Sequence, residues 1–267
     1  MEVDKIPIDA KILMADTERF KSLMQTAYTT LAKYYDLIFS SKDYKNEASF
    51  IEKIVKRRNP QSKSILDIGC GTGTHLNLLR EKFNILHGVD LSPEIIKEAK
   101  RKSSKITYSI GKMANFNLKR KFDVLISLYS VFNYNLSIEE AKKTLINFRR
   151  HLKPNGLIIL ALYTPTNTEK QISLHMGKKA GVEVVKINEF STDEKTNIQT
   201  SNFLVLLKDR NGVDFFTEPN HKYKIYNVDE FTYLMKKAGF KGIEVFDNFT
   251  DKPVSSKTKY PVFVANS

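Results

Sequence analysis

Apolar and polar residues follow one another in blocks along the first two thirds of the chain, and these blocks predict alternating strands and helices. Short apolar runs are typical of buried strands, whereas stretches with apolar residues three or four positions apart are typical of helices that bury one face. The predicted strands span 64–68, 85–91, 106–110, 122–130 and 157–163, and the predicted helices span 74–83, 92–102 and 137–153. This alternation predicts a parallel sheet with helices on both faces.

Capping residues support the predicted helix starts. Ser92 precedes Pro93, which is typical of an N-cap followed by the first helical position. Ser137 and Glu140 have the spacing of a capping box. Asn227 begins the last predicted helix, 227–240.

The pattern changes between residues 164 and 226, where strand-like segments replace helices. The segments 181–190, 198–209 and 221–226 are joined by polar turns, as in antiparallel hairpins. The sequence thus predicts an α/β fold, a doubly wound and mostly parallel sheet with a mostly antiparallel β insert. The predicted parts are an N-terminal helical cap over 1–60, a core over 61–163 and 227–267 that ends in strands 242–246 and 260–265, and the insert over 164–226 as a substrate lid or a dimer face.

Composition indicates a folded protein of the cell interior. A chain of 267 residues can bury a full core, and 41% of its residues are hydrophobic. The single cysteine, Cys70, excludes a disulfide framework and fits a reducing compartment. Residues 1–20 lack the apolar region of a signal peptide, and no uncharged apolar run has membrane-spanning length. We therefore expect a soluble, cytoplasmic protein with no membrane partner.

The net charge of +13 adds nucleic acid to the candidate partners. The lysines are spread along the whole chain, however, and the sequence has neither zinc-finger spacing nor an RNA-recognition motif of the RNP1 type. A generally lysine-rich surface accounts for the charge better. Nucleic acid is kept as an alternative partner.

Three alternating glycines follow the first predicted strand, in the stretch "SILDIGCGTGTHLNLL". Neither register of Gly69, Gly71 and Gly73 fits the G-x-G-x-x-G pattern of dinucleotide sites, and no Gly-Lys-Ser/Thr follows as in a phosphate-binding P-loop. A bare loop of this kind suits a ligand that has an amino-acid end and no phosphates. Asp67 offers an acceptor to backbone amides or to an ammonium group, and Asp90 lies at the distance expected for a carboxylate on a ribose diol. Together these features indicate S-adenosylmethionine.

The stretches "ILDIGCGTG", "GVDLS" and "KFDVLISLYS" resemble those of class I S-adenosylmethionine-dependent methyltransferases, which have a Rossmann-like fold. The resemblance implies that the three glycines form the cofactor loop and that Asp90 binds the ribose. It further implies that Leu91 and Met113 flank the adenine and that Leu128 lies near the sulfonium. Cys70 and His75, in the same glycine stretch, are included among the cofactor-binding residues, Cys70 as a small packing residue rather than a nucleophile.

One position departs from that family. An acidic residue that usually contacts the adenine amino group is replaced by Lys112, which cannot accept a hydrogen bond. We expect either that a backbone carbonyl replaces the acid or that Lys112 points into solvent. Loss of cofactor binding is the third alternative.

The stretches "YYDLI", "KDYKNEA" and "GCGTGTHL" resemble a narrower group, the N-methyltransferases of amino sugars in macrolide biosynthesis. This resemblance implies that Tyr28 points to the acceptor nitrogen and that Tyr35 lies near the cofactor. The active-site histidine of the group falls at Tyr134. His221, in the insert, is a candidate to face the site, with an exposed strand-edge histidine as the alternative.

The predicted function is transfer of a methyl group from S-adenosylmethionine to a small molecule, most simply to an amine such as that of an amino sugar. Tyr28, Tyr134 and His221 are the candidate catalytic residues. An RNA or protein methyltransferase and a non-catalytic cofactor-binding module are the alternatives. No metal is expected, because the five histidines are scattered without ligand spacing. A homodimer is left open.

Overall fold

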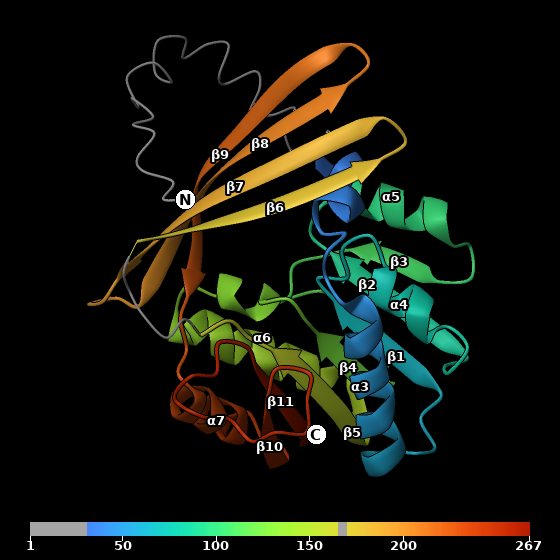
Figure 1. Ribbon diagram of the computed structural model, residues 1–267. Coiled ribbons are helices and arrows are strands. Elements are labelled where there is room, and N and C mark those ends of the chain that lie inside the picture. The colour runs from blue at the N-terminus through green and yellow to red at the C-terminus, as the bar shows by residue number, and fades with distance from the viewer. Residues whose placement is uncertain (1–30, 165–169) are drawn as a thin grey trace.

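The computed structural model describes residues 31–164 and 170–267 and contains a seven-stranded sheet as its centre (Figure 1). Neighbouring strands run in the order β10-β11-β5-β4-β1-β2-β3. All pairings from β3 to β5 are parallel, while β11 runs antiparallel to both β5 and β10. The strands are β1 (Ser64–Ile68), β2 (Ile85–Asp90), β3 (Thr107–Ile110), β4 (Phe122–Ser127), β5 (Leu152–Ala161), β10 (Lys241–Asp247) and β11 (Pro261–Asn266).

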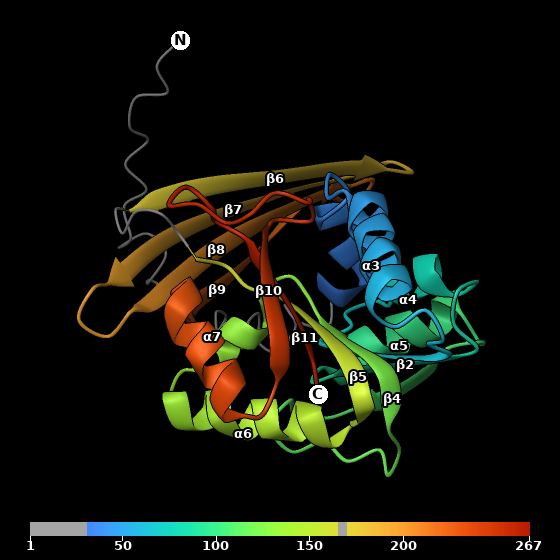
Figure 2. The same ribbon diagram turned by 90° about the horizontal axis from the view of Figure 1, so that it is seen from below.

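Helices cover both faces of this sheet, as the sequence predicts (Figure 2). One apolar core lies under α3, α4 and α5, and a second lies under α6 and α7. The capping residues act as predicted: Ser92 accepts a hydrogen bond from the Ile95 amide, and Ser137 and Glu140 form a capping box. The helices are α3 (Tyr44–Arg58), α4 (Thr74–Leu79), α5 (Pro93–Lys102), the 3-10 turn η1 (Val131–Tyr134), α6 (Ile138–Arg150) and α7 (Val228–Lys237).

A separate four-stranded antiparallel sheet, in the order β6-β7-β8-β9, forms the insert (Figure 1). Its inner face packs on residues 31–39, where Ile38 and Phe39 contact Val184 and Val205 in a small apolar core. Residues 31–38 are helical. They pack on the insert on one side, and Tyr35 among them lies over Gly71 on the other, so the segment lies between the insert and the glycine loop of the large sheet. The strands are β6 (Gln171–Lys179), β7 (Val182–Asp193), β8 (Ile198–Asp209) and β9 (Gly212–Lys224).

The structure adds one strand that the sequence pattern did not predict and shifts several boundaries. Strand β6 was missed because its apolar positions, such as Leu174, face outward and its inward positions include Ser173 and Gly177. Strand β4 ends at Ser127 rather than at residue 130, because Tyr129 and Ser130 adopt left-handed backbone conformations.

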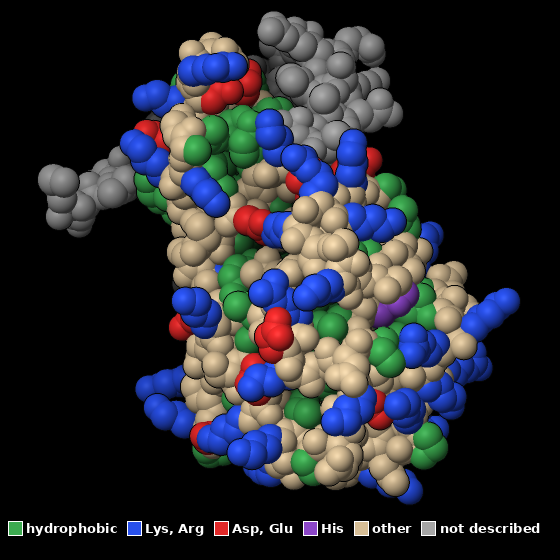
Figure 3. All heavy atoms as spheres, turned by 90° about the vertical axis from the view of Figure 1, so that its right-hand side faces the viewer, with side chains coloured by type: hydrophobic (Ala, Val, Ile, Leu, Met, Phe, Trp, Pro, Cys, Tyr) green, Lys and Arg blue, Asp and Glu red, His purple; other side chains and the backbone are tan. Residues whose placement is uncertain are grey.

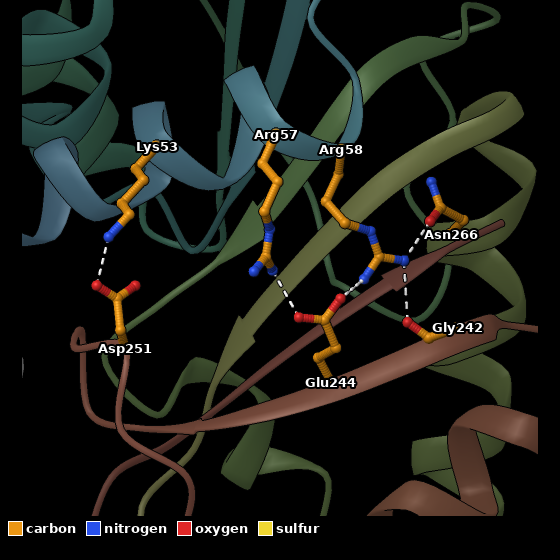
Figure 4. A network of polar contacts seen from close by, with 7 residues as sticks. All are labelled: Lys53, Arg57, Arg58, Gly242, Glu244, Asp251 and Asn266. Atoms are coloured by element: carbon orange, nitrogen blue, oxygen red, sulfur yellow. Dashed lines mark hydrogen bonds and ion pairs between the residues drawn. The ribbon is translucent and has the colours of Figure 1, made fainter.

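Helix α3 is tied to the C-terminal strands by a cluster of polar contacts (Figure 4). The guanidinium of Arg58 donates to the carbonyl oxygen of Gly242 at 2.9 Å and also to Glu244 and Asn266. Arg57 donates to the other oxygen of Glu244. The C-terminal end of α3 is thus held against β10 and β11 at the edge of the sheet. Among the described residues, no helix is both long and apolar enough to span a membrane.

Candidate functional site

The candidate site lies where the strand order reverses. The chain passes from β1 to β2 and β3 on one side and returns to β4 and β5 on the other, so β1 and β4 are neighbours. The loops that follow two such strands separate, and ligands of open α/β sheets bind in the resulting crevice. Here those loops are the glycine loop after β1 and residues 128–130 after β4.

The glycine loop has a geometry that side chains would not tolerate. Gly69 and Gly73 have φ values of +69° and +76°, in the left-handed region that favours glycine. A Cβ atom on Gly69 would lie 2.4 Å from the Val131 side chain, and one on Gly73 would lie 2.1 Å from the Tyr108 hydroxyl. The loop therefore needs glycine at both positions to pass this close to its neighbours.

Asp90 braces the glycine loop from the end of β2. One carboxylate oxygen accepts a hydrogen bond from the Gly71 amide at 3.0 Å, and the other accepts one from the Ser92 amide at 3.0 Å. Burial raises the pKa of Asp90, although these amides oppose the rise. The predicted contact of Asp90 with a ribose remains a prediction, and the structure adds a role in holding the loop.

Asp67, at the carboxyl side of β1, carries an unpaired buried polar atom beside the glycine loop. Its side chain is 2% exposed, and its Oδ2 atom has no hydrogen-bond partner among the described residues. Burial, and secondarily the nearby Asp90, raise the pKa of Asp67 to about 8. A buried carboxyl oxygen without a donor is costly in an isolated protein and indicates a missing donor.

A small cavity adjoins this carboxyl group. Its walls come from the glycine loop, from the start of α4, from the end of β4 and from the segment that precedes α3. The lining residues are Tyr35, Lys42, Tyr44, Asp67, Gly69, Cys70, Gly71, Thr72, Thr74, His75, Leu128 and Tyr129. The unpaired Asp67 oxygen and the bare loop fit the amino-acid end of S-adenosylmethionine, because that end carries an ammonium group and lies against backbone.

Two tyrosines close the crevice. The ring of Tyr35 lies over Gly71, with its Cε1 atom 3.6 Å from where a Cβ would be, so a ligand on the loop has to share this space with Tyr35. Tyr129 follows β4 with a left-handed φ of +54°. The Phe39 ring lies between them, with centroids 4.8 Å from that of Tyr35 and 5.2 Å from that of Tyr129. Tyr35 thus lies over the glycine loop, and its predicted position near the cofactor stays a prediction.

The structure brings Tyr134 and His221 together, although 87 residues separate them in sequence. The Tyr134 hydroxyl lies 3.5 Å from Nδ1 of His221 and 3.1 Å from the hydroxyl of Tyr223. Tyr134 belongs to η1, and the other two residues belong to β9. The core and the insert thus each contribute to one cluster of polar aromatic side chains.

Buried Asn133 fixes the position of this cluster. Its amide group donates to the carbonyl oxygens of Tyr163 at 3.0 Å and of Lys224 at 2.8 Å. Its own carbonyl oxygen accepts from the Tyr163 amide at 3.1 Å. These bonds join η1 to the chain after β5 and to the end of β9, so the two halves of the cluster keep their register.

The remaining predicted site residues have varied environments. Cys70 and Leu128 are buried, Met113 is half-buried, and Leu91 is 61% exposed at the end of β2. Lys112 points into solvent, as one of its alternatives anticipated, and its carbonyl oxygen accepts hydrogen bonds from the Asn115 and Phe116 amides. The predicted contact of Tyr28 lies outside the described residues.

The sequence analysis missed a buried charged cluster beside the glycine loop. Lys42 Nζ lies 3.2 Å from Oε2 of Glu47, and the same oxygen lies 2.6 Å from Nε2 of His75. His75 therefore faces Glu47. The available signal was the "KDYKNEA" stretch, where a charged residue recurs at the start of a helix with an apolar face.

Comparison with known proteins extends these observations. A family model described as a methyltransferase domain matches residues 65–156. The dTDP-3-amino-3,4,6-trideoxy-alpha-D-glucopyranose N,N-dimethyltransferase of Streptomyces venezuelae is 28% identical over 214 residues, which cover 79% of this chain and 90% of that protein.

Solved structures show the same likeness. The crystal structure of DesVI from Streptomyces venezuelae has a TM-score of 0.77 and 27% identity, and the match covers 88% of this chain and 97% of that one. The sugar N-methyltransferase KedS8 from Streptoalloteichus has a TM-score of 0.75 and 25% identity, with coverages of 87% and 92%.

The strand order and the glycine loop are those of the class I methyltransferase fold, and the matched methyltransferase domain and the relatives show an S-adenosylmethionine-dependent methyltransferase. Within that class it resembles the sugar N,N-dimethyltransferases, which confirms the resemblance found in the sequence. The donor of its methyl group is S-adenosylmethionine.

Proposed function

We propose that the protein methylates the amine nitrogen of a small molecule and that its acceptor is an amino sugar, carried on a nucleotide. The observation that carries this proposal is the extent of the likeness. The match to the dTDP-amino-sugar N,N-dimethyltransferase spans 214 residues, whereas the methyltransferase domain itself spans only residues 65–156. The similarity therefore extends to segments outside the methyltransferase domain, and these include the insert.

Methyl transfer depends mainly on how the protein positions the amine and the methyl group, and it needs no strong general base. When bound, S-adenosylmethionine supplies a methyl group that an unprotonated amine can attack directly. The bond from nitrogen to the methyl carbon forms as the carbon–sulfur bond breaks, and the amine loses its proton. Holding the reacting atoms in line supplies on the order of 7–11 kcal/mol of the barrier reduction. The protein must also keep the amine neutral and oriented.

Tyr134 and His221 are suited to that second task. An imidazole nitrogen can accept a proton from an ammonium group, and a tyrosine hydroxyl can orient the amine. The contact between Tyr134 and His221 places both functions in one cluster. We infer that this cluster replaces the single histidine of the related group and that Tyr28 completes the acceptor side.

The insert is proposed to act as the lid of the acceptor site. Lys186 of β7 lies 5.2 Å from the ring centroid of Phe39 and 4.2 Å from that of Phe203. The Phe203 ring lies 5.3 Å from the His221 ring. The inner face of the insert thus connects the segment over the glycine loop with the Tyr134 cluster.

The test is a methyl-transfer assay with isotopically labelled S-adenosylmethionine. The acceptors are dTDP-linked sugars with an amine at C3 or C4, the same sugars with a hydroxyl there, and a bulk RNA. Mass spectrometry should detect label on the amino sugars, added in one or two steps, and none on the hydroxyl analogues or on RNA. Label on the hydroxyl analogues or on RNA, without label on any amine, would contradict the proposal.

Cofactor binding supplies the matching control. Isothermal titration with S-adenosylhomocysteine should give micromolar affinity for the wild type. Asp90→Ala should weaken this affinity at least about tenfold, because the variant removes the carboxylate that braces the Gly71 amide and is expected at the ribose.

A further inference from the structure

The inner face of the insert changes from apolar to polar as it approaches the Tyr134 cluster. The apolar part packs on residues 31–39. The polar part contains Asn188, Gln199 and Ser201, which are 4%, 2% and 2% exposed. Of these three, Gln199 carries a buried side-chain atom, Oε1, that has no hydrogen-bond partner among the described residues.

Gln199 points from the insert towards the core. In the sheet it lies opposite Thr192 of β7 and opposite Tyr223 of β9. Its Nε2 atom donates a hydrogen bond to Oγ1 of Thr192 at 3.2 Å. Burial raises the pKa of Tyr163, and a hydrogen bond with Gln199 opposes this rise, so these two side chains meet. Because Tyr163 follows β5, Gln199 reaches across the junction between the core and the insert.

The missing partner of Gln199 does not depend on how its amide group is turned. A half turn of a side-chain amide exchanges the accepting oxygen and the donating nitrogen. One of the two positions contacts Thr192, and the other has no partner in the part of the chain that the structure describes. A buried polar atom without a partner is costly, so it indicates a polar group that arrives with a ligand.

The position of Gln199 shows which part of an acceptor this group belongs to. The hydroxyl of Tyr223 lies 3.1 Å from that of Tyr134, which is proposed to orient the amine. Residues directly opposite each other in antiparallel strands have Cβ atoms about 4.5–5.5 Å apart, so Gln199 is an immediate neighbour of Tyr223. A ligand that presents its amine to Tyr134 therefore presents the substituent next to the amine to Gln199.

We propose that Gln199 binds a hydroxyl group on a ring carbon next to the amine of the acceptor, and that it thereby selects amino sugars that carry this hydroxyl. The inference rests on the proposed function and deepens it by naming the group that is recognised. A hydroxyl fits better than the amine itself, because each methyl transfer replaces an N–H of the amine, whereas the hydroxyl keeps its hydrogen. Tyr163 is the positioning residue, since it holds the Gln199 amide.

Selection follows from the burial of Gln199. A site that is built to hydrogen-bond a hydroxyl rejects the analogue without it, because the buried group of the protein then stays unpaired. An apolar side chain at position 199 has no polar atom to leave unpaired. It should therefore accept the deoxygenated analogue as well as the hydroxylated one.

Two acceptors that differ only in these hydroxyls test the assignment. dTDP-linked 3-amino-3,6-dideoxyglucose has a hydroxyl on both carbons beside the amine, and its 3-amino-2,3,4,6-tetradeoxy analogue has neither. Each is titrated calorimetrically into protein saturated with S-adenosylhomocysteine, so binding is measured without methyl transfer. The wild type should bind the hydroxylated sugar about tenfold or more tightly. Gln199→Leu should weaken its binding about tenfold without weakening that of the analogue.

Matched variants make the result specific. Tyr163→Phe removes the hydroxyl that holds the Gln199 amide and keeps the ring, so it should reduce the preference severalfold. Thr200→Val changes the next residue of β8, whose side chain lies on the opposite face of the sheet, and should alter neither affinity. All three variants should bind S-adenosylhomocysteine like the wild type, which a general loss of structure would prevent.

The possible outcomes separate this inference from the proposed function. A preference that survives both Gln199→Leu and Tyr163→Phe would overturn the assignment of Gln199, and so would an equal loss of both sugars. Binding of both sugars to the wild type without any preference would also overturn it and would leave the proposed function standing. If neither sugar binds while S-adenosylhomocysteine does, the proposed function falls and the assignment falls with it.

Discussion

The residue that most constrains the site is Asp67. A carboxylate normally avoids a position that is 2% exposed and lacks a hydrogen bond to one of its oxygens. Burial holds its pKa at about 8, so without ligand the group is largely protonated at pH 7. A bound ammonium group would favour the ionised form, so we expect cofactor binding at neutral pH to release a proton.

This raised pKa predicts a pH-dependent stability. The folded state binds a proton at Asp67 more tightly than the unfolded state, whose pKa is near 3.8. The stabilisation is therefore complete below pH 4 and is lost as the pH rises towards 8. Asp67→Asn removes this dependence. Between pH 5 and 8, wild type without ligand should lose about 2–4 kcal/mol of unfolding free energy relative to Asp67→Asn.

Urea denaturation at several pH values measures this difference. Asp123→Asn is the control, because hydrogen bonds from Lys153, Ser64 and Lys63 lower the pKa of Asp123 despite partial burial. The contribution of Asp123 to the unfolding free energy is lost only in acid. Between pH 5 and 8, the unfolding free energy of Asp123→Asn should therefore change with pH as that of the wild type does. A parallel course of wild type and Asp67→Asn would show that Asp67 ionises freely in the folded protein.

The sequence alone was sufficient to predict site residues whose role depends on local chain geometry. The glycine spacing predicted a bare loop, and the position of Asp90 at the end of the second strand predicted a ribose ligand, whereas its hydrogen bond from the Gly71 amide was not predicted. The sequence did not indicate Lys42 or Tyr129. Lys42 is one of many lysines and becomes distinctive only through burial, and Tyr129 only through its left-handed backbone after β4. Neither property has a local signature.

At the scale of elements, helices and core strands followed from periodicity, and the insert followed only in part. Strands β7 and β8 were found because they have long apolar patterns. Strand β6 was missed because an edge strand with outward apolar residues does not show the expected burial pattern. The meeting of η1 with β9 was not predictable either, since it depends on hydrogen bonds between distant segments.

Asn133 is the residue on which that meeting depends, so we predict the effect of Asn133→Ala. The variant removes three hydrogen bonds from a fully buried side chain and leaves the Lys224 and Tyr163 carbonyl oxygens without this donor. We expect a loss of about 1–3 kcal/mol in unfolding free energy, measured by urea denaturation. Methyl transfer should fall further than binding of S-adenosylhomocysteine, because η1 carries Tyr134 and not the glycine loop.

The role of Asn133 is decided by comparing the effect of Asn133→Ala on methyl transfer with its effect on S-adenosylhomocysteine affinity. Unchanged S-adenosylhomocysteine affinity with reduced turnover supports a role on the acceptor side. Equal losses in both would mean that Asn133 stabilises the core as a whole, and full turnover would remove the Tyr134 cluster from the proposed mechanism.

At the scale of the whole molecule, the insert has two different faces. The inner face covers the segment over the cofactor loop, as a lid would. On the outer face of β6, Ile172, Leu174 and Met176 are exposed. The homodimer considered from the sequence stays a prediction, and this outer face is one surface among the described residues that offers exposed apolar side chains for such a contact.

The net charge of +13 is the other property of the whole molecule. On the face that carries α4 and α5, lysine and arginine side chains are scattered among other residues rather than gathered in one stripe (Figure 3). A scattered charge provides a long-range field rather than a defined track for a nucleic-acid backbone. This distribution suits attraction of a small anion, and a nucleotide-linked sugar is such an anion.

The last prediction follows from that field. The screening length shrinks from about 30 Å to about 8 Å as ionic strength rises from about 0.01 to about 0.15 M. If the positive field captures a nucleotide-linked amino sugar, its kcat/KM should fall severalfold over this range. The same amino sugar without its nucleotide is not an anion, so its kcat/KM should stay constant or rise. An equal fall for both acceptors would mean that salt acts on the enzyme itself.

RNA, added as a competitor at low salt, should inhibit methyl transfer only weakly, and the inhibition should disappear in about 0.15 M salt, since non-specific binding to phosphates is the most strongly screened.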